Sequence, residues 1–419
     1  MPIKPASSKP VSSPVDSCAR TSSRLPQAAL PEAVQQRRRL LLGGALGASV
    51  LAGLAACATR KKEAAPVAKT AGDTPLAEQA FTEAELGAFA QPMPLAGSYA
   101  QRPEVMAQVQ AMAQRLRLPE TYVRNAIGNA NFLPSVPRLI LPAGRGVRRN
   151  WQVYRSRFVE PIRIRAGVQF WRENAPALQR AEQEYGVPAH FIVGIIGVET
   201  IFGRHMGNMR VIDTLSTLSF DFPQEHPRAE ARNRFFREEL EAYLLLCASN
   251  RDNPLALHGS YAGAMGLPQF MPSSWLKYAV DYDGNRHIDL FTSPTDAIGS
   301  VAKYFRAFGW EPGLPPVYDV AFDDNRLQLA NLLAPDIRPS FTLQEFAAQG
   351  ALVQAAAPHL GQSGKLALIE LENGQNAPNQ YYAGTQNFYV ITRYNNSSYY
   401  AKAVIDLGEA VKAAINRAV

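Results

Sequence analysis

The sequence is poor in cysteine and histidine, and this scarcity excludes several kinds of chemistry. Its 419 residues include three cysteines, Cys18, Cys57 and Cys247, and six histidines without paired metal-ligand spacing. We therefore expect neither a zinc enzyme nor a cysteine nucleophile. Cys247 lies in an apolar helical segment, where we expect an inert core thiol. The composition, 47% hydrophobic and 19% charged, is typical of a globular protein and excludes disordered and disulfide-scaffold classes.

The chain also has little excess charge once its N-terminal segment is set aside. The formal net charge is +7, but residues 1–56 hold seven basic and two acidic residues, which leaves about +2 for the rest. A nucleic-acid binder needs a dense basic patch in its folded domain, because phosphate contacts dominate such binding. We therefore expect no nucleic-acid partner.

The apolar segment near the N-terminus is too short to span a bilayer comfortably. It has 17 residues, 40–56, after Arg37-Arg38-Arg39, whereas a spanning helix needs about 20. A basic region, a short apolar run and small residues before a cleavage point indicate a secretory signal over residues 1–56. The paired arginines also resemble a twin-arginine signal, and the export route stays open.

The end of this signal carries a lipidation pattern. Residues 54–57 read Leu-Ala-Ala-Cys, which resembles the bacterial lipobox and implies acylation of Cys57 as the mature N-terminus. Several acyl chains on one residue would anchor the protein firmly. Ala58 resembles an outer-membrane sorting signal, which implies a periplasmic protein anchored to the outer membrane of a Gram-negative bacterium. A plain signal peptide and an uncleaved anchor helix are the alternatives.

Hydrophobic periodicity and proline content divide the rest of the chain. We expect a mainly α (α+β) protein, with helical texture resuming at Tyr381. Ser293, with Pro294 and Asp296 behind it, predicts a helix start. The expected regions are lipidated Cys57 with a flexible tether (57–80), an N-terminal helical region (81–157), a helical core (158–312), a small strand-containing insert (313–378) and a C-terminal helical part of the core (379–419).

One acid interrupts a helix that is otherwise apolar all round. We expect this helix over residues 190–202, and Glu199 is its only carboxylate. A helix of this kind belongs in a core, and burial favours the neutral carboxylic acid by raising its pKa. A protonated acid near neutral pH can protonate a leaving group. The alternative is a structural glutamate paired with Arg204 or another base.

Three separated sequence motifs together resemble those of a known protein family. They are residues 194–200 (Gly-Ile-Ile-Gly-Val-Glu-Thr), the glycine-rich loop 260–275 with Gln269, and residues 391–395 (Ile-Thr-Arg-Tyr-Asn). In this order they resemble the membrane-bound lytic transglycosylase B family, over residues 158–310 and 387–404. The resemblance implies a goose-type lysozyme-like helical catalytic core with a groove for the glycan strands of peptidoglycan.

The activity implied by the resemblance is non-hydrolytic. The β-1,4 bond between N-acetylmuramic acid and N-acetylglucosamine is cleaved by the muramyl C6 hydroxyl, which leaves a 1,6-anhydromuramyl end. Glu199 would be the single acid/base, and no cofactor would be required for chemistry. Ser260 would lie beside the site, Gln269 in the groove, and Tyr394 and Asn395 near the acid.

Two other functions stay open. A hydrolytic muramidase needs a second carboxylate. Asp213 and Asp221 are candidates for it if the fold places them close to Glu199. A non-catalytic peptidoglycan-binding lipoprotein would keep Glu199 as a structural acid. In each case we expect peptidoglycan as the partner, a monomer, and contacts with other cell-wall enzymes.

Residues 281–296 resemble an EF-hand calcium loop. Arg286 stands at the position where that loop has glycine, and Thr292 where it has glutamate. A sodium ion or an ion-free turn rich in Asx residues is the alternative. A structural Ca²⁺ would take its oxygen ligands from Asp281, Asp283, Asn285, the backbone carbonyl of His287 and, by the resemblance, Asp296.

Overall fold

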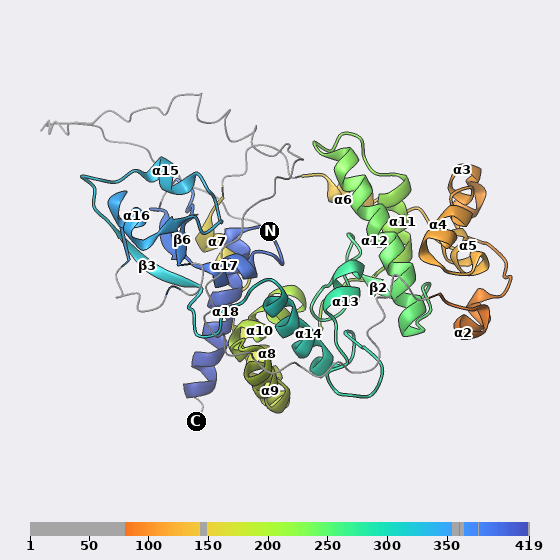
Figure 1. Cartoon of the computed structure of the whole chain (residues 1–419), viewed down its shortest axis with the longest axis horizontal. Coiled ribbons are helices and arrows are strands. Elements are labelled where there is room, and N and C mark those ends of the chain that lie inside the picture. Colours follow the sequence, from red (N-terminus) through yellow and green to blue (C-terminus); the bar gives the residue numbers. More distant parts are fainter. Residues whose placement is uncertain (1–79, 143–148, 354–359, 361–363, 376, 418–419) are drawn as a thin grey trace, which may run out of the picture. The chain divides into compact units, whose positions relative to one another are not determined.

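The computed structural model describes residues 80–142, 149–353, 360, 364–375 and 377–417 (Figure 1). Contacts divide the chain into residues 1–69 and residues 70–419. The expected signal segment, Cys57 and the tether up to residue 79 lie outside the described residues. Within the described ranges, no helix combines the length and the apolar character that a membrane crossing requires.

Short helices build the part before the central core, and two of them begin with a side-chain cap. Thr82 and Glu85 form a capping box at α2, and the Asn150 side chain accepts from the Val153 backbone N–H at the start of α7. The elements are α2 (Glu83–Leu86), η2 (Gly87–Ala90), η3 (Ser98–Gln101), α3 (Pro103–Met106), α4 (Val109–Leu116), α5 (Glu120–Gly128), α6 (Val136–Ile140) and α7 (Trp151–Ser156).

The helical core follows. Ser293 caps α14 as predicted, because its hydroxyl accepts from the Asp296 backbone N–H, and Cys247 is buried. The elements are α8 (Pro161–Glu173), α9 (Ala175–Tyr185), α10 (Ala189–Thr200), β1 (Met209–Arg210), α11 (Val211–Phe220), α12 (Ala229–Asn250), β2 (His258–Gly259), α13 (Pro272–Tyr278) and α14 (Pro294–Ala307).

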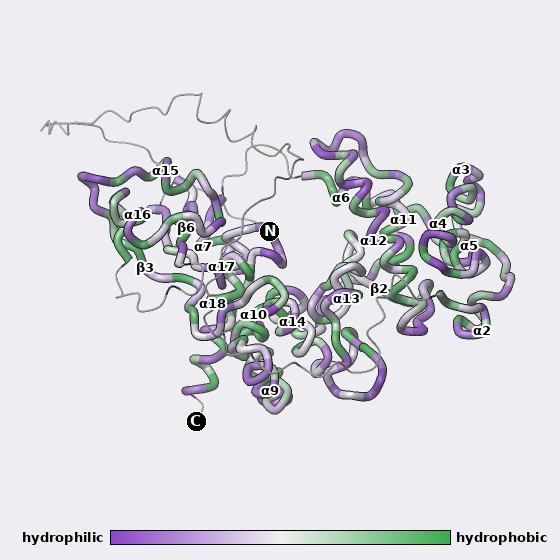
Figure 2. The backbone as a smooth tube through the Cα atoms, viewed as in Figure 1, coloured by the Kyte–Doolittle hydropathy of each residue, from purple (hydrophilic) through white to green (hydrophobic). Residues whose placement is uncertain are grey.

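The central helix pair is α10 with α18 (Ser398–Arg417). All residues of α10 are buried except Glu199, and Figure 2 shows the apolar character of this part of the chain. Glycines let the two backbones approach closely, since a Cβ at Gly194 would lie 2.4 Å from the Val404 carbonyl oxygen and one at Gly408 2.2 Å from that of His190. This packing brings α18 against the helix that carries the acid.

An antiparallel five-stranded sheet follows α14, in the order β4-β6-β7-β3-β5. A separate small core lies against it, with Leu332, Phe346 and Leu368 at its centre. The elements are β3 (Val317–Phe322), α15 (Leu329–Leu333), β4 (Phe341–Thr342), α16 (Leu343–Ala348), β5 (Ala351–Val353), β6 (Lys365–Leu371), β7 (Gln380–Gly384) and α17 (Gln386–Ile391).

The expectation of helix from Tyr381 is wrong for the first four residues. Residues 381–384 belong to β7, where Tyr382 pairs with Ile369 of β6 and with Asp319 of β3. Adjacent tyrosines favour a strand when partners exist on both sides, and those partners lie far away in the sequence. Helical structure resumes at α17, where Thr385 provides the N-cap.

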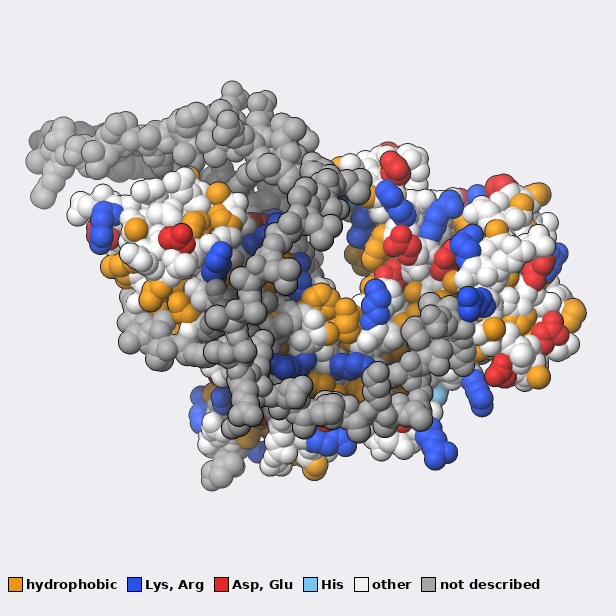
Figure 3. All heavy atoms as spheres, viewed as in Figure 1, with side chains coloured by type: hydrophobic (Ala, Val, Ile, Leu, Met, Phe, Trp, Pro, Cys, Tyr) orange, Lys and Arg blue, Asp and Glu red, His pale blue; other side chains and the backbone are white. Residues whose placement is uncertain are grey.

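The sheet also holds α7 in place. The carbonyl oxygen of Glu372, directly after β6, accepts from the Trp151 backbone N–H (2.8 Å) and from the Tyr399 hydroxyl (3.1 Å). One residue of the insert therefore fixes both α7 and α18 (Figure 1). On the face drawn in Figure 3, basic and acidic side chains of the described residues are interspersed, as expected from the small net charge beyond residue 56.

Candidate active site

Glu199 occupies the last turn of α10, where the backbone changes hand abruptly. The helix ends at Thr200, and Ile201, Phe202 and Gly203 follow with φ of 51°, 55° and 89°. The helix thus ends two residues before the predicted end and begins one residue earlier than predicted. A β-branched residue in the left-handed region is strained, at a cost of about 1–2 kcal/mol. Such strain persists only when surrounding contacts hold it.

The Thr200 side chain supplies one of those contacts. Its hydroxyl donates to the Leu267 carbonyl oxygen (2.9 Å) and accepts from the Gly203 N–H (3.0 Å). Leu267 belongs to the glycine-rich loop of residues 260–275, so this hydroxyl joins the end of α10 to that loop. The position of Glu199 is therefore fixed relative to the second sequence motif.

Arg163 of α8 supports the same turn from another side. Its buried guanidinium donates from Nε to the Gly197 carbonyl oxygen (2.8 Å), two residues before Glu199. A cation at the C-terminal end of a helix is favourable for the helix dipole. In the described part of the chain no ion pair joins Glu199 to Arg204 or to another basic side chain.

Burial raises the pKa of the Glu199 carboxyl group to about 7. The Tyr400 hydroxyl donates to Oε1 at 2.5 Å, which stabilises the charged form and lowers the pKa in part. A carboxyl group with this pKa is present in both protonation states near neutral pH. It can therefore give a proton in one step and take one in the next.

Three phenols from separate elements interact electrostatically with this carboxyl group: Tyr154 of α7, Tyr394 of the turn after α17, and Tyr400 of α18. Burial raises the pKa of each phenol, and the Glu199 charge raises it further. All three therefore stay neutral hydrogen-bonding groups around the acid.

The motif of residues 391–395 separates into a buried and an exposed part. The Tyr394 ring packs 4.7 Å from Tyr304 and 5.8 Å from Phe270, measured between ring centroids. Its buried hydroxyl has no hydrogen-bond partner among the described residues. Asn395 is exposed, and its backbone oxygen accepts from the Ser397 N–H. The structure thus brings Tyr394 to Glu199 and leaves Asn395 at the surface.

Gln269 and Ser260 hold the loop in shape. Gln269 has a left-handed backbone (φ 50°), and its Nε2 donates to the carbonyl oxygens of Met206 (3.1 Å) and Gly266 (3.0 Å). The Ser260 hydroxyl oxygen accepts from the Ala264 N–H at 3.0 Å. Both side chains therefore brace the loop that Thr200 ties to α10.

The EF-hand-like loop brings together three of its five predicted ligands. Oxygens of Asp281, Asp283 and Asp296 lie within 4.8 Å of one another, and carboxylate oxygens are what Ca²⁺ prefers. Asn285 Oδ1 instead accepts from the His287 N–H (2.8 Å). Of the donors expected from the sequence, the carboxylates alone already form a group that fits a hard cation.

The two departures from the EF-hand pattern are accommodated locally. Arg286 takes a left-handed backbone (φ 72°), the conformation that glycine provides in an EF-hand. Asp296 accepts from the backbone N–H groups of Tyr282 (2.7 Å) and Asp289 (2.9 Å). Its carboxylate thus faces the loop, while its own N–H is capped by Ser293.

The two acids considered as a second carboxylate are engaged elsewhere. Asp213 forms an ion pair with Arg210 (2.6 Å), and Asp221 forms one with Arg102 (2.7 Å) and accepts from the Tyr99 hydroxyl. Neither contributes to the pKa of Glu199. A hydrolase would need one of them free and opposite the acid.

Sequence reasoning missed Tyr154, Tyr400 and Arg163. Tyr400 lies inside the stretch of resemblance, beside Tyr399, but no spacing distinguishes which of the two faces the acid. The contact of Tyr400 with Glu199 spans 201 positions of sequence. Only the packing of α18 on α10 reveals it.

Comparison with known proteins gives consistent matches. The family described as Transglycosylase SLT domain matches residues 101–409. Membrane-bound lytic murein transglycosylase B of Escherichia coli (strain K12) is 40% identical over 331 residues, 76% of this chain and 85% of that protein. The crystal structure of soluble lytic transglycosylase SltB1 from Pseudomonas aeruginosa is similar with a TM-score of 0.66 and 41% identity, covering 76% of this chain and 100% of that one. The Escherichia coli lytic transglycosylase Slt35 in complex with calcium has a TM-score of 0.65 and 39% identity, covering 77% of this chain and 97% of that one.

Proposed function

Because the chain belongs to the Transglycosylase SLT domain family, we propose that Glu199 is the single acid/base with which it cleaves murein. The chain is a lytic murein transglycosylase with the lysozyme-like fold of its structural relatives. In the proposed reaction the β-1,4 bond between N-acetylmuramic acid and N-acetylglucosamine breaks without water. The product carries a 1,6-anhydromuramyl end.

The observation that carries this proposal is the state of the Glu199 carboxyl group. It is largely enclosed, its pKa is raised to about 7, and one phenol donates to it. A glutamate kept only for stability would be paired or replaced by an apolar residue, because an unpaired buried acid is costly. A carboxyl group poised near neutral pH is what general acid–base catalysis requires.

The proposed reaction uses one proton twice. Protonated Glu199 gives its proton to the glycosidic oxygen as the bond from C1 to that oxygen breaks. The resulting carboxylate takes the proton of the muramyl C6 hydroxyl as that oxygen bonds to C1. Glu199 ends protonated, and the atoms balance without water. No second carboxylate is required, because the substrate supplies the nucleophile.

The surrounding tyrosines fit separate parts of this cycle. Tyr400 donates to the carboxylate and so stabilises the form that exists between the two proton transfers. Tyr394 has a buried hydroxyl without a partner among the described residues, and in the proposal it orients a polar group of the sugar. We assign substrate contacts in the groove to Ser260, Gln269 and Asn395 by the family motif alone.

A hydrolytic muramidase is the second candidate, and the ion pairs of Asp213 and Asp221 disfavour it. The two enzymes would cleave the same glycosidic bond, so the extent of cleavage does not distinguish them, but the chemical structure of their products does. Purified murein digested by the protein should yield fragments lighter by one water, with 1,6-anhydromuramic ends, in mass spectrometry. Reducing ends would instead require a hydrolase, and intact murein that co-sediments with the protein would require a binding lipoprotein.

For the loop of residues 281–296 we propose a structural Ca²⁺. The support is the group of Asp281, Asp283 and Asp296, together with a relative whose structure is described as a complex with calcium. The ion would neutralise three carboxylates that otherwise repel one another. It would hold the loop before α14 and take no part in the proton transfers.

For localisation we propose a lipid on Cys57 that anchors the protein to the outer membrane, facing the periplasm. The support is the signal pattern of residues 1–57 and the name of the Escherichia coli relative, which is membrane-bound. Peptidoglycan glycan strands are then within reach of a monomer on its tether. Contacts with other cell-wall enzymes fit the same placement.

A further inference from the structure

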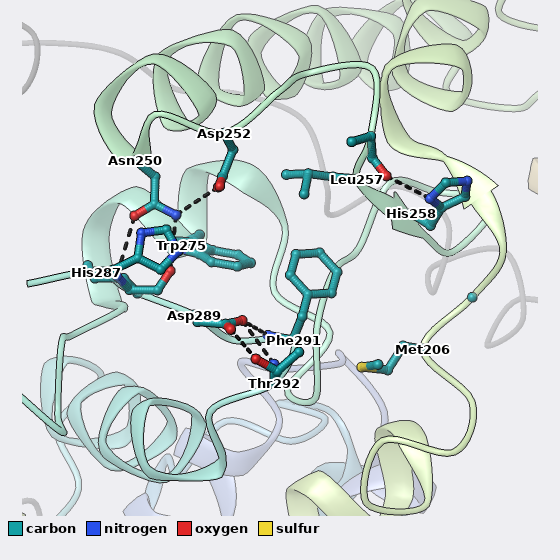
Figure 4. A pocket seen from close by; sticks show the side chains of 13 residues that line it. Met206, Asn250, Asp252, Leu257, His258, Trp275, His287, Asp289, Phe291 and Thr292 are labelled. Atoms are coloured by element: carbon teal, nitrogen blue, oxygen red, sulfur yellow. Dashed lines mark hydrogen bonds between the residues drawn. The ribbon is translucent and has the colours of Figure 1, made fainter. Parts of the chain in front are cut away.

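Three charged side chains, which we call the charged cluster, join the short helix α7 to α18. The Asp406 carboxylate accepts from Arg155 Nε through Oδ2 (2.5 Å) and from the Lys402 ammonium group through Oδ1. The side chain of Asp406 is only 12% exposed and that of Lys402 only 10%. The pocket drawn in Figure 4 is separate, because its lining residues all fall between Met206 and Thr292. The cluster therefore belongs to the helix packing around Glu199.

The cluster is part of two helix faces that pack on each other. Residues three or four positions apart lie on the same side of a helix. The facing residues are Trp151, Tyr154 and Arg155 on α7 and Tyr399, Lys402 and Asp406 on α18. The Tyr399 ring lies 5.9 Å from that of Trp151 and 5.7 Å from that of Tyr154, measured between centroids. The Lys402 ammonium nitrogen lies 6.0 Å from the centroid of the Trp151 ring.

The helix α7 depends on other elements for its position. It has six residues, too few to be stable through its own hydrogen bonds. The insert holds its first turn, where the Gln152 N–H donates to Asn373 Oδ1 (3.1 Å) close to the contact of Trp151 with Glu372. At its last turn, the pair of Arg155 with Asp406 is the one hydrogen bond or ion pair found between α7 and α18 in the described residues. The orientation of this last turn therefore depends on Asp406.

Tyr154 lies in the same turn, directly before Arg155. Its phenol interacts electrostatically with Glu199. The contacts of its side chain within the described ranges are ring contacts, with Trp151, Phe158 and Tyr399. The Tyr154 hydroxyl is not among the fully enclosed atoms that lack a partner, so it is open to a ligand. A group of this kind can form a hydrogen bond with a substrate next to the acid.

Stability alone does not explain the charged cluster. Well-packed apolar residues in place of a buried ion pair often leave a protein equally or more stable. Arg155 is 44% exposed, and ion pairs that reach the solvent contribute little to the free energy of unfolding. What a charged hydrogen bond provides is a fixed direction. Both oxygens of Asp406 are used in this way, one toward α7 and one toward Lys402 of its own helix.

We propose that Asp406 is a positioning residue for murein cleavage, which holds the Tyr154 hydroxyl beside Glu199 through its ion pair with Arg155. The inference rests on the proposed function, because the Tyr154 hydroxyl then forms a hydrogen bond with the reacting sugar. Lys402 orients the Asp406 carboxylate, and its ammonium nitrogen lies 4.7 Å from the centroid of the Tyr382 ring in β7.

Arg155→Gln tests the proposal, because it removes the link to α7 and leaves the pair of Asp406 with Lys402 in place. Initial rates of release of soluble fragments from purified murein, measured over a range of murein concentrations, give kcat and KM. Arg155→Gln and Tyr154→Phe should each lower kcat about tenfold, the effect of one hydrogen bond made in the transition state. KM should stay within about twofold of the wild-type value.

The double variant connects the two residues. Arg155→Gln combined with Tyr154→Phe should be no slower than either single variant, because both changes remove the same hydrogen bond. Arg155→Lys keeps the cation and should recover most of the rate. Asp406→Asn should show the loss in kcat of Arg155→Gln together with a lower melting temperature, because Lys402 loses its carboxylate partner. If Asp406→Asn does not fold, the Arg155 variants still decide the question.

The insert provides a matched control. Arg326→Gln removes an ion pair of the same kind, from Nε to Asp323 Oδ2 at 2.7 Å, and should leave kcat unchanged. The proposal is wrong if the double variant loses about a hundredfold in kcat, the product of two independent effects. It is also wrong if Arg155→Gln leaves kcat unchanged or changes KM alone. The proposed function fails on different evidence, namely reducing ends among the products or cleavage by Glu199→Gln, so the two failures are distinguishable.

Discussion

Removal of a single hydroxyl, in Tyr400→Phe, should move the alkaline limb of the pH–rate profile. The Tyr400 hydroxyl donates to Oε1 of Glu199 and holds the pKa of that carboxyl group below the value that burial alone would set. Without the donor, the charged form is less stable and the pKa rises above about 7. A general acid must be protonated, so kcat/KM falls as pH rises through this pKa.

The size of the shift follows from the contact. A hydrogen bond to a charged group contributes about 1.5–3 kcal/mol, and 1.36 kcal/mol corresponds to one pH unit. The alkaline limb of kcat/KM should therefore move upward by about one unit and by no more than about two. The assay is release of soluble anhydromuropeptides from purified murein, followed across the pH range by chromatography.

The adjacent tyrosine provides a matched control. Tyr399 loses the same atom in Tyr399→Phe, but its hydroxyl donates to the Glu372 carbonyl oxygen and not to the acid. That variant should keep the alkaline limb in place. An unchanged limb in Tyr400→Phe, a downward shift, or an equal shift in both variants would refute the role assigned to Tyr400.

Four further outcomes are expected. Glu199→Gln should abolish murein cleavage and keep the fold, because an amide of the same shape has no acidic proton; near-normal turnover would exclude Glu199 as the catalyst. The unfolding free energy of the same variant should increase relative to that of the wild type as the pH rises from 4.5, the ordinary pKa of glutamate, through about 7, the pKa of buried Glu199. The increase should be at most about 3 kcal/mol. A raised pKa favours the folded state only while the acid is protonated. If denaturant titrations gave the same difference in unfolding free energy between Glu199→Gln and the wild type at acidic and alkaline pH, this would argue against a raised pKa of Glu199. Calcium should raise the melting temperature of the wild type and of Asp324→Asn, an exposed acid of the insert, but not that of Asp281→Ala, and no shift in any of them would remove the ion. Cys57→Ala should lose labelling by a fatty-acid analogue and leave the outer-membrane fraction, whereas retained labelling would place the lipid elsewhere.

Local chemistry made much of the fold predictable. The capping residues of α14 and the all-apolar pattern of α10 depend on neighbours in sequence, and both are found as predicted. The strand β7 was not predictable in this way. Its residues 381–384 become a strand because β6 and β3 lie on either side, and neither partner is visible from the local pattern.

The acid was predictable for the same reason, since a lone carboxylate in an apolar helix is a local signal. Its partners were not. Tyr154 and Tyr400 lie on helices that meet Glu199 only after α7 and α18 are fixed by Glu372 and by the glycine contacts of α10. Asn395 shows that membership in a sequence motif does not by itself place a residue at the acid, because this neighbour of Tyr394 lies exposed at the surface.

The central claim is that Glu199 transfers a proton twice while the substrate, not water, supplies the nucleophile. Digestion of purified murein in water labelled with the heavy oxygen isotope tests it most directly. Anhydromuramic ends without isotope label are expected from the wild type, and no new ends from Glu199→Gln. Label at C1 of the newly formed muramic ends would show attack by water and contradict the account.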